Sequence, residues 1–250
     1  MIDIVQKCGQ ANTTSKSNRD IDYIVIHYTA GVTSKAGTAA STAAYFAKTS
    51  TQASADFIVD DETIVQYNPD IENRYCWAVG GSKLNTQGGS LHGIATNANC
   101  ISIEICSTND TGKITSANDS HWSFTDAVVD NALELTKYLM QEYNIDADHV
   151  IRHWDTTGKY CPGLIGWNID SGDDSAWLAF KAKLKEADDM TGEEIYTKLN
   201  EYLTEQEAPD WAQDELQEAI DMGITDGTRP MQLIPRYQAA IMAKRAAEAK

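Results

Sequence analysis

The segment Ile21-Asp-Tyr-Ile-Val-Ile-His27 does most to indicate the fold. Its β-branched and aromatic residues lie between polar stretches, which is typical of a buried strand, and a histidine stands at its end. A second segment, Cys100-Ile-Ser-Ile-Glu-Ile-Cys106, alternates in polarity. Because successive side chains of a strand point to opposite faces, Ser102 and Glu104 are expected to share one face of this second strand.

The other predicted elements surround these two strands. Residues 149–153 predict a short strand that again ends in histidine, and residues 56–59 and 63–67 predict a β-hairpin. Residues 41–48 predict a short helix capped by its first residue, and residues 125–143 predict an amphipathic helix. The order of strands and helices predicts an α/β fold with a central mixed β-sheet flanked by helices.

The composition changes near residue 186, which predicts two domains. Residues 1–185 contain the β-rich segments, whereas residues 191–250 are rich in Ala, Glu, Gln and Leu at helical spacing. The second part predicts a small all-helical module with helices at about 193–206, 209–222 and 235–247. About 60 residues make a marginal independent fold, so we expect this module to dock on the larger domain or to self-associate.

Composition excludes several classes of protein. The 250 residues carry a formal net charge of −17, with 42% hydrophobic and 23% charged residues, so the chain is globular and is not a general nucleic-acid binder. No apolar run is long enough for membrane insertion. The N-terminus lacks the pattern of a signal peptide, and the five cysteines show no close pairing. We therefore expect a cytoplasmic location with reduced thiols.

His27, His153 and Cys161 are the residues whose chemistry suggests a site. Strand ends meet at one edge of a sheet, where residues distant in sequence converge. Two imidazoles and a thiolate suit zinc, and three protein ligands leave one position open. A lone histidine at a strand end is more often a hydrogen-bonded core or surface residue, so both interpretations are open at this point.

Glu104 and Lys159 are candidate catalytic residues. A carboxylate in an apolar strand is unfavourable unless it is paired or used, and desolvation would raise its pKa enough for a general base. Glu104 equally suits an open sheet face or pairing with an arginine. Lys159, two residues before Cys161, suits an oxyanion-stabilising cation or a solvated loop residue.

His92 and Trp77 are weaker candidates for contact with a substrate. His92 follows a glycine-rich stretch that could border a cleft. Trp77 suits a binding platform or core packing equally well.

The order of motifs in residues 15–185 resembles that of the zinc-dependent N-acetylmuramoyl-L-alanine amidases of the amidase-2 type, a family that includes peptidoglycan recognition proteins, phage endolysins and bacterial autolysins. The matching segments are Ile24-Val-Ile-His27-Tyr-Thr, Ala53-Ser-Ala-Asp-Phe-Ile-Val-Asp60, Asn99-Cys-Ile-Ser-Ile-Glu104, His149-Val-Ile-Arg-His153 and Gly158-Lys-Tyr-Cys161-Pro-Gly163.

The resemblance implies roles for individual residues. It implies that His27, His153 and Cys161 bind Zn²⁺, that Glu104 is the general base, and that Lys159 stabilises the oxyanion. It implies cleavage of the amide bond between N-acetylmuramic acid and L-alanine in peptidoglycan, as in an endolysin that reaches the wall after release.

The chain departs from the family at two places. Asp56 and the preceding Ala55 stand where several relatives have a Tyr-His pair, and we expect Asp56 to contact substrate or to orient a ligand histidine. Ala78, next to Trp77, stands where a histidine is common, so we do not expect the substrate contact of that histidine here.

The C-terminal module and the activity each have more than one interpretation. Residues 211–245 resemble part of an S-layer-homology module, which implies wall attachment or homo-oligomerisation, and a helical extension packed on the larger domain fits equally. The alternatives for the whole chain are a non-catalytic peptidoglycan-binding protein, an autolysin or recycling amidase, and a zinc peptidase that cuts the stem peptide.

Overall fold

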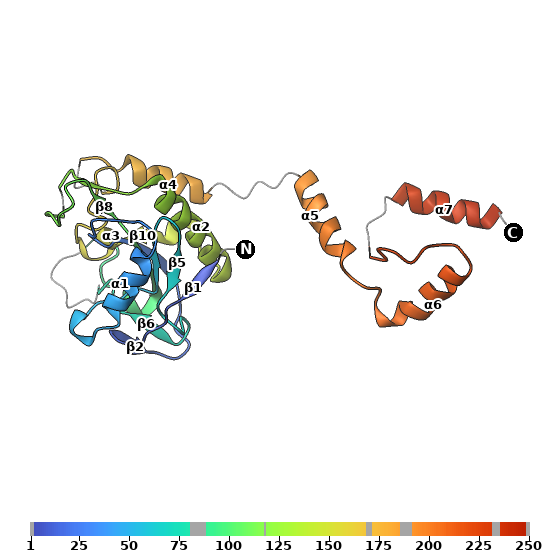
Figure 1. Cartoon of the computed structure of the whole chain (residues 1–250), viewed down its shortest axis with the longest axis horizontal. Coiled ribbons are helices and arrows are strands. Elements are labelled where there is room, and N and C mark those ends of the chain that lie inside the picture. Colours follow the sequence, from blue (N-terminus) through green and yellow to red (C-terminus); the bar gives the residue numbers. More distant parts are fainter. Residues whose placement is uncertain are drawn as a thin grey trace. The chain divides into compact units, whose positions relative to one another are not determined.

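The computed structural model describes residues 3–80, 89–117, 119–168, 172–185, 192–231 and 236–248. The chain forms two compact units, Met1–Ala187 and Asp188–Lys250 (Figure 1). All five cysteines are free thiols. Within the described ranges, no helix combines the length and the apolar character that crossing a membrane requires.

A mixed six-stranded sheet forms the centre of the first unit, in the order β1-β5-β4-β7-β3-β10. Its strands are β1 (Ile4–Gln6), β3 (Tyr23–Tyr28), β4 (Phe57–Val59), β5 (Ile64–Gln66), β7 (Cys100–Ile105) and β10 (Val150–Arg152). β4 and β5 pair antiparallel, as the predicted hairpin requires, and all other neighbours pair parallel. The predicted α/β fold with a central mixed sheet is confirmed.

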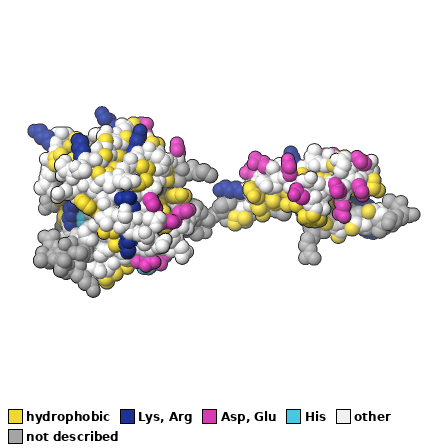
Figure 2. Space-filling view, turned by 90° about the horizontal axis from the view of Figure 1, so that it is seen from below, with side chains coloured by type: hydrophobic (Ala, Val, Ile, Leu, Met, Phe, Trp, Pro, Cys, Tyr) yellow, Lys and Arg dark blue, Asp and Glu magenta, His cyan; other side chains and the backbone are white. Residues whose placement is uncertain are grey.

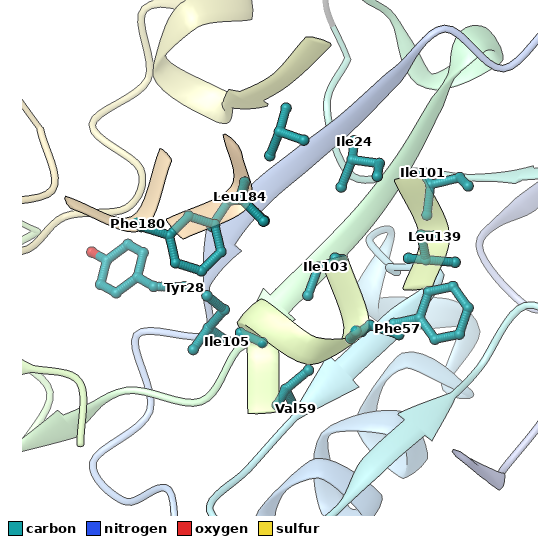
Figure 3. Packing of buried hydrophobic residues seen from close by; sticks show 14 of the residues in the cluster. Ile24, Tyr28, Phe57, Val59, Ile101, Ile103, Ile105, Leu139, Phe180 and Leu184 are labelled. Carbon is teal, nitrogen blue, oxygen red and sulfur yellow. The ribbon is translucent and has the colours of Figure 1, made fainter. Parts of the chain in front are cut away.

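Helices α2 (Asp126–Glu142) and α4 (Ser175–Lys185) cover one face of this sheet. The buried side chains that form this part of the core come from alternate strand positions and from both helices (Figure 3). They include Ile24, Ile26, Phe57, Val59, Ile101, Ile103, Ile105, Leu135, Leu139, Phe180 and Leu184. The period of two along β3 and β7 therefore leaves His27 and Glu104 to the opposite face.

On the opposite face, α1 (Thr38–Phe46) covers one part, and the segments around Val79 and Ala95 cover another. Ala39, Ala43 and Phe46 of this helix pack against Ile58 and Val65 of the hairpin. Its main contacts with the sheet are to β4 and β5. This offset leaves room above the ends of β3 and β7, where the polar side chains lie.

Helix α1 begins earlier than the sequence predicts. It starts at Thr38 rather than at Ser41, and the Ser41 hydroxyl donates to the Gly37 carbonyl at 2.9 Å instead of capping the helix. The backbone N–H of Ala39, in the first turn of α1, donates to the carboxylate of Asp60 in the hairpin turn at 2.9 Å. The start of α1 therefore depends on a tertiary contact that local sequence does not reveal.

Shorter elements complete the first unit. β2 (Thr13–Ser15) pairs with β6 (Arg74–Cys76), and β8 (Thr108–Asn109) pairs with β9 (Trp122–Ser123). Three 3₁₀ turns, η1 (Thr49–Thr51), η2 (Asn97–Asn99) and η3 (Ala147–His149), and the short helix α3 (His153–Thr157) lie between the larger elements.

The second unit contains α5 (Gly192–Thr204), α6 (Asp210–Asp221) and α7 (Arg236–Glu248). Pro209 precedes α6, and Gly223 follows it with a φ of 69°, the conformation that ends helices. The predicted cap at residue 191 and the predicted start at residue 235 lie outside the described residues. Acidic side chains gather on the visible face of this unit, with hydrophobic side chains exposed beside them (Figure 2). The exposed hydrophobic residues of α5 are Ile195, Tyr196, Leu199 and Tyr202.

The core on the α2 side makes a direct prediction for stability. Leu135 is fully buried between α2 and the sheet, so Leu135→Ala should lower the free energy of unfolding by about 2–5 kcal/mol. Leu178→Ala on α4 is the control, because Leu178 is 58% exposed, and its effect should stay within about 0.5 kcal/mol. Urea unfolding of the full chain measures both, and equal losses would contradict this packing.

Candidate active site

Register across three parallel strands places His27, Glu104 and His153 in one row. His27 of β3 is the register partner of Glu104 of β7. On the other side of β3, Arg152 of β10 pairs with Ile26, so His153, one residue further, is level with His27. The two imidazole rings lie with centroids 4.7 Å apart. The predicted convergence of strand ends is therefore present at this rim.

Cys161 reaches the same place from a loop. Its Sγ lies 3.8 Å from Nδ1 of His27. The backbone N–H of Cys161 donates to the Lys159 carbonyl at 2.7 Å, and its carbonyl accepts from Trp154 N–H at 3.0 Å. These bonds tie the loop to the first turn of α3, which begins at His153. The loop therefore keeps the Cys161 thiol close to the start of α3, where His153 lies.

The three side chains fit a divalent metal ion. One donor atom from each of His27, His153 and Cys161 lies within 4.8 Å of the others, and all three residues are buried. Within the described part of the chain, Nδ1 of His153 and Nε2 of His27 are buried nitrogens with no hydrogen-bond partner. Buried polar atoms normally have partners, so the unpaired Nδ1 of His153 is suited to a metal ligand, as is Nδ1 of His27, the ring nitrogen that lies near the Cys161 thiol.

Burial keeps both imidazoles neutral. It lowers the pKa of His27 well below the usual value, and the nearby His153 and Lys159 lower it further. Burial, with a smaller contribution from Lys159, lowers the pKa of His153 to about 3. Burial likewise raises the pKa of Cys161 to about 12 in the metal-free protein. Neutral imidazole is the form that donates to a metal, whereas the thiol must release its proton on binding.

Glu104 stands beside the three candidate ligands, and its carboxyl group is desolvated. Loss of solvent raises its pKa to about 8, and the positive charge of Lys159 lowers it less than burial raises it. Its Oε2 is buried with no hydrogen-bond partner among the described residues. A carboxyl group with a pKa near neutrality suits proton transfer, which is the property that the sequence interpretation required of a general base.

A cleft of about 560 Å³ opens onto Glu104, His27 and Cys161. Lys159 and Tyr160 line one part of it, and α1 with the segment around Trp77 lines another. Tyr45 and Trp77 keep 54% and 40% of their surface exposed, so both present aromatic faces to solvent.

Of the three residues predicted to contact substrate, one lines the cleft and two do not. Trp77 lines the cleft, and its indole N–H donates to the Thr14 hydroxyl at 2.8 Å. Asp56 and His92 are absent from the described lining of the cleft. Asp56 is buried, and its carboxylate accepts from Asn68 at 2.7 Å and from the Ser102 N–H at 2.8 Å. These bonds favour a structural role that fastens β4 to β7, and they do not include a ligand histidine.

Sequence reasoning missed the α1 wall of the cleft. Thr38, Ser41, Thr42 and Tyr45 all line it. Their spacing of i, i+3, i+4 and i+7 places them on one helical face, and that polar stripe is a signal in the sequence. It could not be interpreted alone, because the position of α1 beside the cleft depends on tertiary packing.

A buried His–His–Cys cluster with a carboxylate beside it, at the rim of an α/β sheet, is typical of a metal-dependent hydrolase site. The sequence pattern of the Amidase_2 family, described as N-acetylmuramoyl-L-alanine amidase, matches residues 17–164. The chain therefore belongs to this family, and the matched residues include His27, Glu104, His153 and Cys161.

Individual relatives agree with this assignment. The chain is 30% identical over 144 residues to N-acetylmuramoyl-L-alanine amidase CwlA of Bacillus subtilis (strain 168), covering 58% of this chain and 44% of the relative. It is 33% identical over 160 residues to N-acetylmuramoyl-L-alanine amidase XlyA of the same strain, covering 64% and 43%. The chain thus spans less than half the length of these curated relatives.

A solved structure supports the same fold. A mutant endolysin from Bacillus subtilis is 30% identical and superposes with a TM-score of 0.52, covering 74% of this chain and 99% of the other. The similarity is thus to nearly the whole of a solved endolysin chain, which agrees with the mixed sheet and helices described above.

The raised pKa of Glu104 predicts how metal-free stability depends on pH. Below pH 4.5 the carboxyl is neutral in both states, whereas between 4.5 and about 8 the unfolded chain ionises and the folded chain keeps the proton. The contribution of Glu104 to stability is therefore fully present at low pH and is lost as pH rises through about 8. Glu104→Gln should consequently stabilise the metal-free protein more at pH 9 than at pH 5.

Urea unfolding in the presence of a chelator measures this difference. Glu134→Gln, at an exposed position of α2, is the control and should show no such trend. A stability difference for Glu104→Gln that is the same at both pH values would contradict a strongly desolvated carboxyl group.

Proposed function

We propose that this chain is a zinc hydrolase that cleaves the amide bond between N-acetylmuramic acid and L-alanine in bacterial peptidoglycan, in the manner of an endolysin. The observation that carries the proposal is the buried His27–His153–Cys161 cluster beside Glu104, inside the segment that matches the amidase family. The names of the curated relatives state the same activity for those proteins.

His27, His153 and Cys161 would hold the zinc ion. When bound, zinc supplies a Lewis acid that polarises the amide carbonyl and makes water more acidic. The neutral state of both imidazoles favours this ligation, because no proton has to leave a ring nitrogen first.

Glu104 carries the proton in the reaction. As the water oxygen bonds to the lactyl carbonyl carbon, the Glu104 carboxylate accepts a proton from that water. When the carbon–nitrogen bond breaks, Glu104 returns the proton to the amine of L-alanine, so that the products are a lactyl carboxylic acid and a free amino terminus. Desolvation raises the pKa of Glu104 toward neutrality, and a carboxyl group with such a pKa can both accept the proton from water and donate it to the amine.

Lys159 provides positive charge on the same side of the cleft. It lines the cleft with Glu104, and it opposes the burial that raises the pKa of both Glu104 and Cys161. A cation there stabilises negative charge that develops on the carbonyl oxygen during attack. The aromatic faces of Tyr45 and Trp77 provide contact area for the sugar or the stem peptide.

The second unit and the place of action are parts of the same proposal. Exposed apolar residues on α5, among them Ile195, Leu199 and Tyr202, support a role in attachment or self-association. The name of the solved endolysin supports action on the cell wall after release.

The first prediction of this proposal concerns the products. The full chain should release fragments with new L-alanine amino termini from purified peptidoglycan, and a chelator should abolish the release until Zn²⁺ is restored. Mass spectrometry identifies the bond that is cut. New reducing sugar ends, cleavage within the stem peptide, or release that is unaffected by the chelator would each contradict the proposed reaction.

The second prediction separates proton transfer from metal binding. Glu104→Gln should lower kcat by at least about 100-fold while the zinc content per chain stays unchanged. Cys161→Ser should lower the zinc content itself, whereas Cys8→Ser, at an exposed position far from the cluster in sequence, should not. Near-wild-type turnover in Glu104→Gln would remove Glu104 from the role of base.

A further inference from the structure

A single side-chain oxygen holds the cleft wall that follows Trp77. Oδ1 of Asn97 accepts hydrogen bonds from three consecutive backbone N–H groups, those of Ala78 at 3.1 Å, Val79 at 2.7 Å and Gly80 at 3.0 Å. The three donors identify the atom as the carbonyl oxygen of the amide, because the NH₂ group could accept none of them. Asn97 therefore fixes the path of the backbone through residues 78–80.

Asn97 is itself firmly placed. It opens the 3₁₀ turn η2, and Thr96 caps this turn with a bond to Ala98 N–H at 3.3 Å. At the other end of η2, the Asn99 side chain donates to Asp22 at 3.0 Å, directly before β3 begins. The oxygen of Asn97 is thus presented by a turn that is anchored to the same strands that carry the site.

Val79, the central residue of the held segment, packs against the strands that lead to the two histidines. Its side chain is 2% exposed and lies in one cluster with Val25 and Ile151. Val25 precedes His27 by two positions and shares its face of β3, whereas Ile151 lies on β10, two residues before His153 begins α3. Movement of Val79 would therefore disturb the packing of β3 and β10 directly before His27 and His153.

The backbone of Val79 also contacts the His153 ring directly. It forms a hydrogen bond with this ring, and the bond raises the pKa of His153 against the larger lowering by burial. A bond that raises the pKa of a histidine stabilises the protonated ring, so the Val79 carbonyl is the acceptor. Because Nδ1 of His153 has no partner among the described residues, the donor of this bond is Nε2–H. The bond selects the tautomer in which Nδ1 carries a lone pair that faces the cluster.

We propose that Asn97 is a positioning residue for His153, acting through the backbone of residues 78–80 to hold the ring in the orientation and tautomer that leave Nδ1 available as a metal ligand. The expected effect on metal affinity rests on the proposed function, because it requires that His153 binds zinc. The orientation and the tautomer can be observed without any metal. Partners that orient ligand histidines typically change metal affinity by 10- to 100-fold when they are removed.

Substitutions at Asn97 distinguish positioning from general stability. Asn97→Ala removes the only oxygen that serves all three N–H groups, whereas Asn97→Asp keeps an acceptor of the same length. Asn131→Ala is the matched control, because it removes one hydrogen bond, to the Asp60 carbonyl at 3.0 Å, from α2 on the other side of the sheet.

The experiment measures Zn²⁺ affinity of the full chain by competition with a chromophoric chelator, together with the thermal midpoint. Asn97→Ala should weaken Zn²⁺ binding by at least about 10-fold, Asn97→Asp should stay within about threefold of wild type, and Asn131→Ala should lower the midpoint without changing affinity. Wild-type affinity in Asn97→Ala, or an equal loss in Asn131→Ala, would overturn the proposal.

A second measurement uses the metal-free protein. The ¹⁵N chemical shifts of the His153 ring should report a protonated Nε2 in the wild type and in Asn97→Asp, and a mixture of tautomers in Asn97→Ala. An unchanged tautomer in Asn97→Ala would overturn the positioning role even if affinity fell. If the wild type bound no Zn²⁺, the proposed function would fail, and these ring shifts would still decide the role of Asn97.

Discussion

The parallel pairing of β3 with β7 on one side and β10 on the other is the constraint on which the site depends. This pairing sets Glu104 opposite His27 and brings His153 level with both. A slip of one residue in the β3–β7 pairing would turn Glu104 toward the opposite face, and a slip in the β3–β10 pairing would move His153 out of line with His27. The hydrophobic residues that alternate with these side chains prevent such a slip, because Ile24, Ile26, Ile101 and Ile103 are fully buried against α2 and α4. The core thus specifies the register, and the register specifies the site.

The same arrangement explains why reactive groups can remain desolvated. One face of the sheet supplies apolar packing through α2, whereas α1 covers only part of the other face. The polar side chains therefore lie deep enough for burial to dominate their pKa values, yet they border an open cleft. Their desolvation is unfavourable for stability, and it produces the neutral imidazoles and the nearly neutral carboxyl group that metal binding and proton transfer need.

The sequence predicted the parts of this arrangement that depend on local pattern. Alternation in β7 identified the face that carries Glu104, and the strand ends indicated where His27 and His153 would meet. It predicted less where tertiary contacts decide. The start of α1 depends on Asp60 from the hairpin turn, and Asp56 serves Asn68 and the β7 backbone rather than the cleft. The wall held by Asn97 was also missed, because a side-chain oxygen that binds three distant N–H groups leaves no periodic signal.

X-ray absorption at the zinc edge on the purified full chain, with zinc content measured on the same sample, tests directly whether these three residues hold one ion. We expect one zinc per chain, with one sulfur ligand at about 2.3 Å and imidazole nitrogens at about 2.0–2.1 Å. A zinc shell without sulfur, or a protein that retains no zinc after mild dialysis, would contradict the assignment of His27, His153 and Cys161 as one metal site.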